Sequence, residues 1–320
     1  MNKQDILRRV GNPDQLISIR ESVMTDGKAK GSRIITVETG KFSITLLPDR
    51  GFDVASVRYM GTNVSFMSKN GIVSAEFAHT NAVSFVSCFT GGFLYTCGLD
   101  NIGDPTEGSV LHGNQSVVPA MRISIDRYWN GDDYCAKICG YLENTALFGQ
   151  NIVVKRTYTF KYDSDEFGIV DEIENRSFTD SGYMMLYHYN LGYPMVDDGA
   201  KIELDRESTV ARTEDAQKVI DKMLSFSEPV DVIPEYVFIH KLKGDNPTAK
   251  LVNEKLGLAF SLTYNKKNLP YFCQWKSLAS GDYVLGLEPA SCALNAKEKT
   301  ILKPFEKAVN GFVIKVERIC

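Results

Sequence analysis

Three ionisable residues stand at an expected strand end or next to a glycine or a proline: His112, His188 and Glu288. Glu288 follows the apolar run 285–287 and precedes Pro289, so we expect its carboxylate at the end of a buried strand. Burial raises the pKa of a glutamate from about 4.3 towards neutrality, where the group works as a general base. A histidine with a pKa of about 6.5 supplies the matching acid. The three side chains could therefore move protons on one substrate, or equally hold a metal ion.

The stretch around His188 is the most suggestive part of the chain. Residues 183–187 have the composition of a strand, and the chain then breaks at Gly192 and Pro194. The pattern predicts that His188 stands at the end of a rigid strand, beside an irregular segment, where catalytic groups are common. The alternative is a buried, hydrogen-bonded core histidine among tyrosines. Any histidine chemistry must use the four histidines of the chain, which are His79, His112, His188 and His240.

Composition excludes several classes of protein. The chain has 320 residues, of which 43% are hydrophobic, and 36 basic against 40 acidic residues give a net charge of −4. No long run of Lys or Arg marks a nucleic-acid partner, and no apolar stretch is long enough to span a bilayer. The N-terminus lacks a signal-peptide pattern, and the seven cysteines contain no CxxC pair. We therefore expect a cytoplasmic protein with buried free thiols.

Strand patterns dominate the chain after two short helical turns at 5–10 and 14–17. Short β-rich runs separated by Gly, Asn, Asp and Pro predict an all-β sandwich or barrel. The runs are 33–39, 41–47, 54–59, 121–125, 135–138, 152–161, 167–175, 183–187, 234–242, 249–252, 256–264, 271–275, 283–289, 299–303 and 311–316. One longer helix is predicted at 213–224 from its apolar spacing. With no repeat or linker, we expect a single domain over 1–320, with 1–30 as a helical or extended lead-in.

Three further segments bear on a site. Arg50 lies between Asp49 and Asp53, and it either satisfies its own turn or points into a cleft to bind a polyol or carboxylate. The glycine-rich segment 89–103 lacks both nucleotide-loop patterns, so no nucleotide cofactor is expected. In the run 234–242, strand alternation places Glu235 and His240 on opposite faces, so the two cannot share one site.

Several short motifs resemble the aldose 1-epimerase (galactose mutarotase) superfamily. They occur in that superfamily's order: Leu111-His112-Gly113, Tyr187-His188-Tyr189-Asn190-Leu191-Gly192-Tyr193 and Gly286-Leu287-Glu288-Pro289. The stretch 40–51 also resembles the superfamily's opening strands. The resemblance covers nearly the whole chain and is greatest to an incompletely characterised, aldose 1-epimerase-like branch.

The resemblance implies a β-supersandwich with few short helices and an open cleft that binds a sugar. It implies that Glu288 is the general base that takes the proton of the anomeric hydroxyl, and that His188 is the general acid that protonates the ring oxygen. Ring opening and closure would then interconvert the anomers. It further implies that His112 binds the sugar and that Glu235 falls near a substrate-binding Asp of the superfamily. Neither a metal nor a cofactor is implied.

The chain departs from the superfamily before the first histidine, where the usual Asn and Arg pair is missing. We expect Asn101 and Arg50 to take over these roles, so the substrate is a monosaccharide or a modified sugar, neutral or anionic. A homodimer is left open. Two alternatives remain: a non-catalytic carbohydrate-binding or regulatory protein on the same fold, and a metal-dependent sugar isomerase or lyase that uses His112, His188 and Glu288 as ligands.

Overall fold

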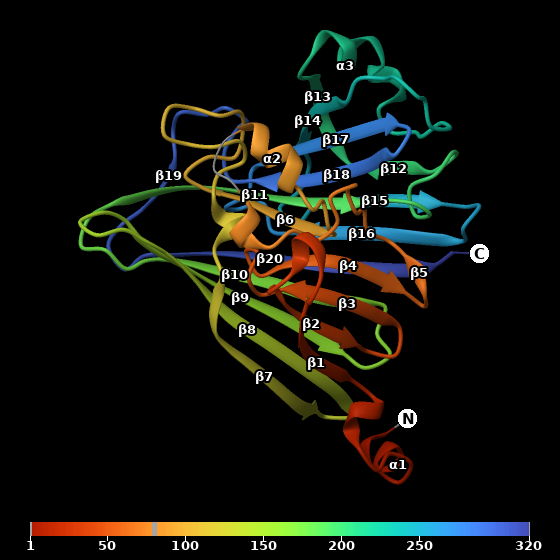
Figure 1. Cartoon of the computed structure of the whole chain (residues 1–320). Helices are drawn as coiled ribbons and strands as arrows, with labels where there is room; N and C mark the ends of the chain where they lie inside the picture. The colour runs from red at the N-terminus through yellow and green to blue at the C-terminus, as the bar shows by residue number, and fades with distance from the viewer. Residues whose placement is uncertain (1, 79–81, 320) are drawn as a thin grey trace.

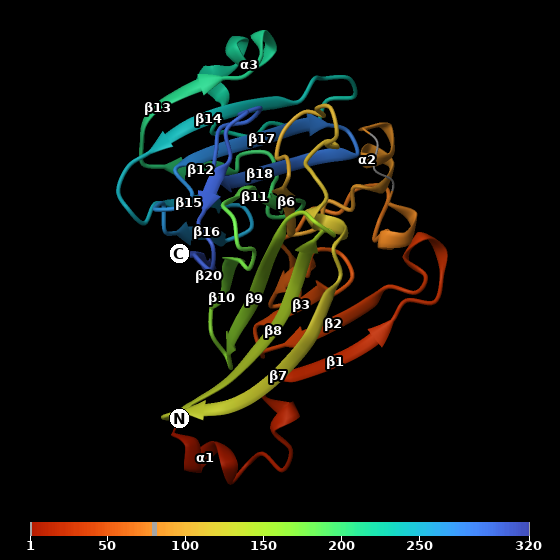
Figure 2. The same cartoon turned by 90° about the vertical axis from the view of Figure 1, so that its left-hand side faces the viewer.

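Antiparallel strands form most of the chain in the computed structural model, which describes residues 2–78 and 82–319 (Figure 1). Within these residues the α-helices are few and short: α1 (Lys3–Leu7), α2 (Ala82–Cys88) and α3 (Glu214–Lys218). The predicted all-β class with few short helices is confirmed. In both Figure 1 and Figure 2, α1 and α3 lie at opposite ends of the molecule.

The first sheet has twelve strands and carries the candidate site. Its main order is β1-β2-β3-β4-β6-β11-β18-β17-β14-β13, while β5 pairs with β4 and β19 with β11. The strands are β1 (Ser18–Val23), β2 (Arg33–Glu38), β3 (Phe42–Leu47), β4 (Asp53–Tyr59), β5 (Thr62–Asn63), β6 (Leu94–Leu99), β11 (Ser181–Leu191), β13 (Arg206–Ala211), β14 (Tyr236–Leu242), β17 (Tyr271–Ala279), β18 (Asp282–Ala290) and β19 (Thr300–Leu302).

The second sheet has eight strands in the order β12-β15-β16-β20-β10-β9-β8-β7. They are β7 (Ala120–Asn130), β8 (Asp133–Thr145), β9 (Asn151–Lys161), β10 (Glu166–Asn175), β12 (Lys201–Leu204), β15 (Thr248–Asn253), β16 (Leu258–Tyr264) and β20 (Lys307–Arg318). Buried positions alternate along β9 and β10, as they do when one face of a sheet covers a core.

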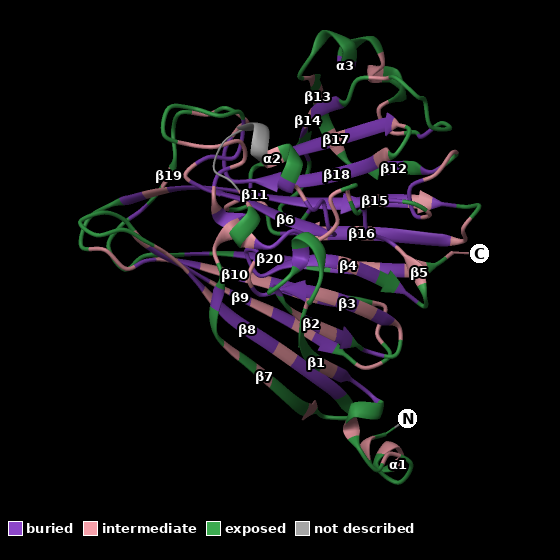
Figure 3. Ribbon diagram, in the orientation of Figure 1, coloured by how far each residue is buried: buried purple, intermediate pink, exposed green. Residues whose placement is uncertain are grey.

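The main hydrophobic core lies between the two sheets. Phe93, just before β6, packs its ring 5.7 Å from Tyr189 of the first sheet and 5.9 Å from Phe260 of the second. Buried residues follow the facing strands, and exposed residues gather in the loops and short helices (Figure 3). One face of the first sheet thus packs against the core, and its other face does not.

A buried ionic network also ties the sheets together. Arg156 of β9 is fully buried and binds Asp53 of β4 at 2.6 Å and Asp171 of β10 at 2.7 Å. Thr96 of β6 donates to Asp53 and accepts from Arg156, and Tyr187 of β11 donates to Asp171. A buried charge is tolerated where it is paired and hydrogen-bonded in this way.

Some elements differ from the sequence-based expectation. Strand β11 continues through His188 to Leu191, because Tyr189 pairs with Leu94 of β6 and with Leu287 of β18. The prediction that His188 ends a strand is therefore wrong. Within 213–224, α3 spans only Glu214–Lys218, because Val219 leaves the helical conformation with φ of −119°; a 3₁₀ turn follows over Ile220–Lys222.

Candidate functional site

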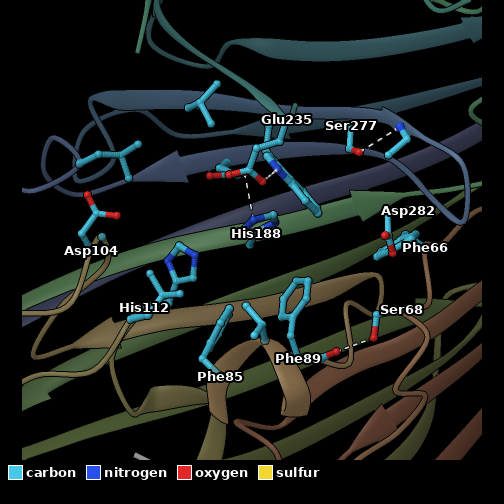
Figure 4. A pocket seen from close by; sticks show the side chains of 18 of the residues that line it. Phe66, Ser68, Phe85, Phe89, Asp104, His112, His188, Glu235, Ser277 and Asp282 are labelled. Carbon is cyan, nitrogen blue, oxygen red and sulfur yellow. Dashed lines mark hydrogen bonds and ion pairs between the residues drawn. The ribbon is translucent and has the colours of Figure 1, made fainter. Parts of the chain in front are cut away.

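A cavity of about 670 Å³ lies on the face of the first sheet that points away from the second sheet (Figure 4). Strand alternation fixes this face. Tyr187 turns inwards and packs its ring 4.5 Å from that of Phe312 in β20, so His188 turns to the opposite side and lines the cavity. From β18, Glu288 lines the same cavity.

His188 and Glu288 form the centre of the site. The pairs Leu186–Ala290 and Tyr189–Leu287 bracket them, so the two residues stand opposite each other on neighbouring strands. Nε2 of His188 lies 3.1 Å from Oε1 of Glu288, and both side chains are at most 6% exposed. Neither Nδ1 of His188 nor Oε1 of Glu288 has a hydrogen-bond partner among the described residues. Because both atoms belong to side chains that line the cavity, a bound ligand can supply the missing partners.

Burial holds both members of the pair in their neutral forms. Burial, together with the charge of Glu235 and against the effect of Arg212, raises the pKa of Glu288 to about 8. Burial, together with nearby His112, lowers the pKa of His188 to about 3. At neutral pH the imidazole of His188 is therefore uncharged and the carboxyl of Glu288 is protonated, so the pair holds one titratable proton, on Glu288. Pairs of groups whose pKa values are pushed apart are typical of acid–base sites.

Gly286 makes room for this pair. A Cβ atom at position 286 would lie 2.7 Å from Oε1 of Glu288, 2.9 Å from Cε1 of His188 and 3.0 Å from Cβ of Trp275. Any side chain at this position would clash with His188 and Glu288. The lack of room for a side chain thus explains the glycine in the Gly286-Leu287-Glu288-Pro289 motif.

His112 approaches the pair from the loop between β6 and β7. Its ring centroid lies 6.0 Å from that of His188, and it lines the cavity. Nδ1 of His112 lies 2.9 Å from the carbonyl oxygen of Ile102. Because a carbonyl only accepts, Nδ1 carries the proton and Nε2 remains an acceptor. Burial lowers the pKa of His112, so the ring is neutral near pH 7.

Asn101 does not line the cavity. Its amide nitrogen donates to the carbonyl oxygens of Gly103, Asp104 and Val110, and its Oδ1 accepts from the backbone of Gly103. The expectation that Asn101 contacts the substrate is therefore not met, because its polar atoms are used within its own loop. It instead holds the loop that carries His112.

Arg50 also lies outside the cavity. It is buried, and it donates from Nε to the carbonyl of Ser116 at 2.9 Å and from Nη1 to that of Val73 at 2.5 Å. Neither neighbouring acid is its partner, since Asp49 binds Arg33 and Asp53 binds Arg156. Both sequence-based interpretations of Arg50 are wrong, because buried backbone carbonyls take its donors.

The guanidinium in the cavity belongs to Arg212 instead, which follows β13. Its Nη2 lies 2.6 Å from Oδ2 of Asp104, on the loop that carries His112. Glu235, just before β14, lines the cavity as expected and accepts a hydrogen bond of 2.7 Å from Nε1 of Trp275. His240 is bound elsewhere, to Thr209 and Gln274. Arg212 was not among the expected site residues, because the strand that precedes it, β13, was not predicted.

Aromatic rings form much of the remaining wall and were also missed. The Trp275 ring lies 5.3 Å from His188 and 6.4 Å from Phe66, and Phe89 lies 6.0 Å from His188. Phe85 of α2 joins them, 5.3 Å from Phe89. An amphipathic lining with a few convergent polar groups is typical of small-molecule sites.

Three further findings concern other sequence-based expectations. Among residues 2–78 and 82–319, no three His, Cys, Asp or Glu side chains are grouped so that they could hold a metal ion. Six cysteines in the same residues are free and buried, as predicted; His79 and Cys320 lie outside the described residues. No helix in the described part of the chain has the length and apolar character needed to cross a membrane.

The fold defines the class: it is that of galactose mutarotase-like proteins. A Klebsiella pneumoniae structure, provisionally named an aldose 1-epimerase, matches with a TM-score of 0.90 and 22% identity, covering 96% of this chain and 87% of the other. A galactose mutarotase-like protein from Clostridium acetobutylicum matches with a TM-score of 0.67 and 12% identity, covering 95% of this chain and 100% of the other. A Salmonella typhimurium protein, provisionally named a mutarotase, matches at 0.63 and 11%, covering 94% of each chain.

The chain belongs to the family described as a domain of unknown function, DUF4432, whose profile matches residues 29–302. No curated protein matches the sequence.

Proposed function

We propose that the protein is an aldose 1-epimerase-like isomerase that interconverts the anomers of a sugar. The observation that carries this proposal is the buried pair of His188 and Glu288, 3.1 Å apart, with an unpartnered polar atom on each. One acid and one base side by side on a rigid sheet are what ring opening and closure of a hemiacetal require.

In the proposed reaction, Glu288 takes the proton of the anomeric hydroxyl while His188 protonates the ring oxygen. The bond between the anomeric carbon and the ring oxygen breaks, and an aldehyde forms. Rotation about the neighbouring carbon–carbon bond and the reverse steps then give the other anomer. This needs an ionised Glu288 and a protonated His188, which together hold the same single proton as the neutral pair. Sugar hydroxyls that replace lost water around the pair favour this charged arrangement.

The other cavity residues suit a neutral sugar. Nε2 of His112 can accept from a hydroxyl, and Oε1 of Glu235 can do the same while Oε2 is held by Trp275. Aromatic faces are electron-rich and pack against the C–H face of a sugar ring. The cation Arg212 is already paired with Asp104, and Lys69 with Asp282, so the described lining of the cavity offers no free cation to an anionic group. We therefore favour neutral over anionic substrates.

Two coarser proposals accompany this one. Both sheets share one core, so we propose that the chain acts as a single domain. The buried free thiols suit a reducing compartment, and we place the protein in the cytoplasm.

The test is anomeric exchange measured by proton NMR across a panel of reducing sugars, with the Glu288→Gln variant as the matched control. We expect the wild type to accelerate exchange of at least one sugar well above the spontaneous rate. Binding of sugars without acceleration would assign the protein to the non-catalytic, carbohydrate-binding alternative.

A further inference from the structure

The cavity is longer than one sugar ring. Glu288 and Asp282 both line it from β18, six positions apart (288 − 282). At a rise of about 3.3 Å per residue, these two positions are roughly 20 Å apart. Figure 4 shows Asp104 and His112 towards one end and Phe66 and Asp282 towards the other. A hexose whose reacting carbon lies at the acid–base pair fills only one end of this space.

We call the other end the distal part, defined by Phe66, Lys69, Ser277, Ala279 and Asp282. Ser277 and Ala279 follow Trp275 on β17 at steps of two, so all three face the cavity. Phe66 and Trp275, 6.4 Å apart, form an aromatic wall. At the end, Nζ of Lys69 lies 2.8 Å from Oδ2 of Asp282.

The distal part has the chemistry of a sugar subsite. Its aromatic wall suits the C–H face of a ring, while the hydroxyl of Ser277 and the exposed ion pair can hydrogen-bond sugar hydroxyls. Lys69 has its own carboxylate partner, so a negatively charged unit gains no free cation. The volume of about 670 Å³ is also in the range of drug-sized ligands, about 300–1,000 Å³.

We propose that the distal part is a second subsite, which holds a neutral sugar unit attached to the reacting ring. The inference rests on the proposed function and names its substrate class. Ring opening requires a free anomeric hydroxyl, so the second unit must be attached at another position of the reacting ring. The substrate is therefore a reducing disaccharide, not a glycoside with a blocked anomeric centre.

The kinetic test compares anomeric exchange of glucose and galactose with that of lactose, maltose and cellobiose. We expect kcat/KM to be roughly tenfold higher for at least one disaccharide, equivalent to about 1.4 kcal/mol. Ala279→Phe fills the distal part and should remove this preference through a roughly tenfold loss on the disaccharide. Val313→Phe, on an exposed position of β20, is the matched control for adding a ring. Equal kcat/KM for both sugar classes in the wild type, or equal losses in Ala279→Phe, would overturn the proposal.

A binding test separates this inference from the proposed function. The chain has two tryptophans, Trp129 and Trp275. Trp129 lies on β7 of the second sheet and packs against Tyr134, so Trp129→Phe leaves Trp275 as the reporter in the cavity. Titration of its fluorescence with maltose and glucose should show tighter binding of the disaccharide. Tighter binding of the disaccharide without turnover of any sugar would contradict the proposed function but support the second subsite. Turnover with equal affinity for maltose and glucose would support the proposed function but contradict the second subsite.

Discussion

Nε2 of His188 lies 3.1 Å from Oε1 of Glu288, yet both groups are neutral at pH 7 and the contact is not a hydrogen bond. A stable buried ion pair would have its remaining polar atoms satisfied. Here each partner keeps an unpartnered atom, and burial pushes each pKa towards the neutral form. These two features are the basis for the proposal that the pair exchanges a proton with a ligand.

Glu288→Gln removes the base while it keeps the shape of the side chain. We expect kcat to fall by about 10²–10⁴-fold, the usual contribution of a general base. Because the wild-type carboxyl is already protonated at neutral pH, its amide replacement should leave the melting temperature unchanged or slightly higher. NMR exchange and thermal unfolding measure the two effects. Unchanged turnover on the true substrate would remove Glu288 from the base role.

The pH dependence of kcat/KM reports the single proton of the pair. The raised pKa of Glu288 means that the pair keeps this proton below pH of about 8 and loses it above. We therefore expect a plateau near neutrality and a fall in kcat/KM through about pH 8, with apparent pKa values that belong to the pair. Spontaneous exchange, measured with Glu288→Gln, must be subtracted. A rise through pH 8 would show that ionised Glu288 with neutral His188 is the active form.

The stability of the fold should also depend on pH through the carboxyl of Glu288. The folded pKa of Glu288, about 8, lies above its ordinary value of 4.5, so the folded state binds this proton more tightly. The contribution of this proton to the free energy of unfolding is complete below a pH of about 4.5 and is lost as the pH rises towards 8. His188, with a lowered pKa of about 3, acts in the opposite direction between about pH 3 and 6.5. Thermal unfolding from pH 6.5 to 8 should therefore decline more steeply in wild type than in Glu288→Gln, and parallel curves would contradict the assignment.

His188→Asn tests the acid. Proton donation matters only in the transition state, so kcat should fall more than the affinity for the sugar. Nδ1 has no hydrogen-bond partner among the described residues, so few bonds are lost in the folded state. An active variant with a clearly lower melting temperature would instead assign His188 to packing against Trp275 and Phe89.

Arg156 should be far more important for the fold than for the site. Arg156→Met leaves Asp53 and Asp171 buried without their charge partner, which costs about 3–5 kcal/mol. The control is Arg33→Met, which breaks the pair with Asp49 where the arginine side chain is 48% exposed; such a pair is worth about 0–1 kcal/mol. Denaturant unfolding compares the two. Similar small losses would mean that water reaches the Arg156 network.

The strands were predictable where alternation and turn residues mark them, as along β9, β10 and β20. β6 was missed because it lies within the glycine-rich segment 89–103, and β13 because most of its residues are polar. Of the site residues expected from the sequence, His112, His188, Glu235 and Glu288 line one cavity in the structure. Arg50 and Asn101 show the limit: a sequence does not reveal which backbone carbonyls will need a donor.

The strand order β11-β18-β17-β14-β13 accounts for the residues that were missed. It brings Trp275 and Arg212 to the cavity that His188 lines, although neither is near His188 in the sequence. This order is set by long-range pairing of whole strands, which no local motif encodes. Short motifs in a fixed order therefore located His188 and Glu288, while the other residues of the cavity wall became apparent only in the structure.

Arg212 and Arg50 give opposite predictions from the same substitution. Arg212 lines the cavity and is 32% exposed in its pair with Asp104, so Arg212→Ala should cost little stability but weaken sugar binding, by roughly tenfold in KM. Its charge lowers the pKa of Glu288, so its removal should move the fall in kcat/KM to a pH above about 8. Arg50→Ala leaves the buried carbonyls of Ser116 and Val73 without these donors, at about 1–3 kcal/mol each, and should lower the melting temperature with KM unchanged. The measurements are KM, the pH profile and thermal unfolding of both variants. A change of KM in Arg50→Ala at unchanged stability would return Arg50 to the sugar site.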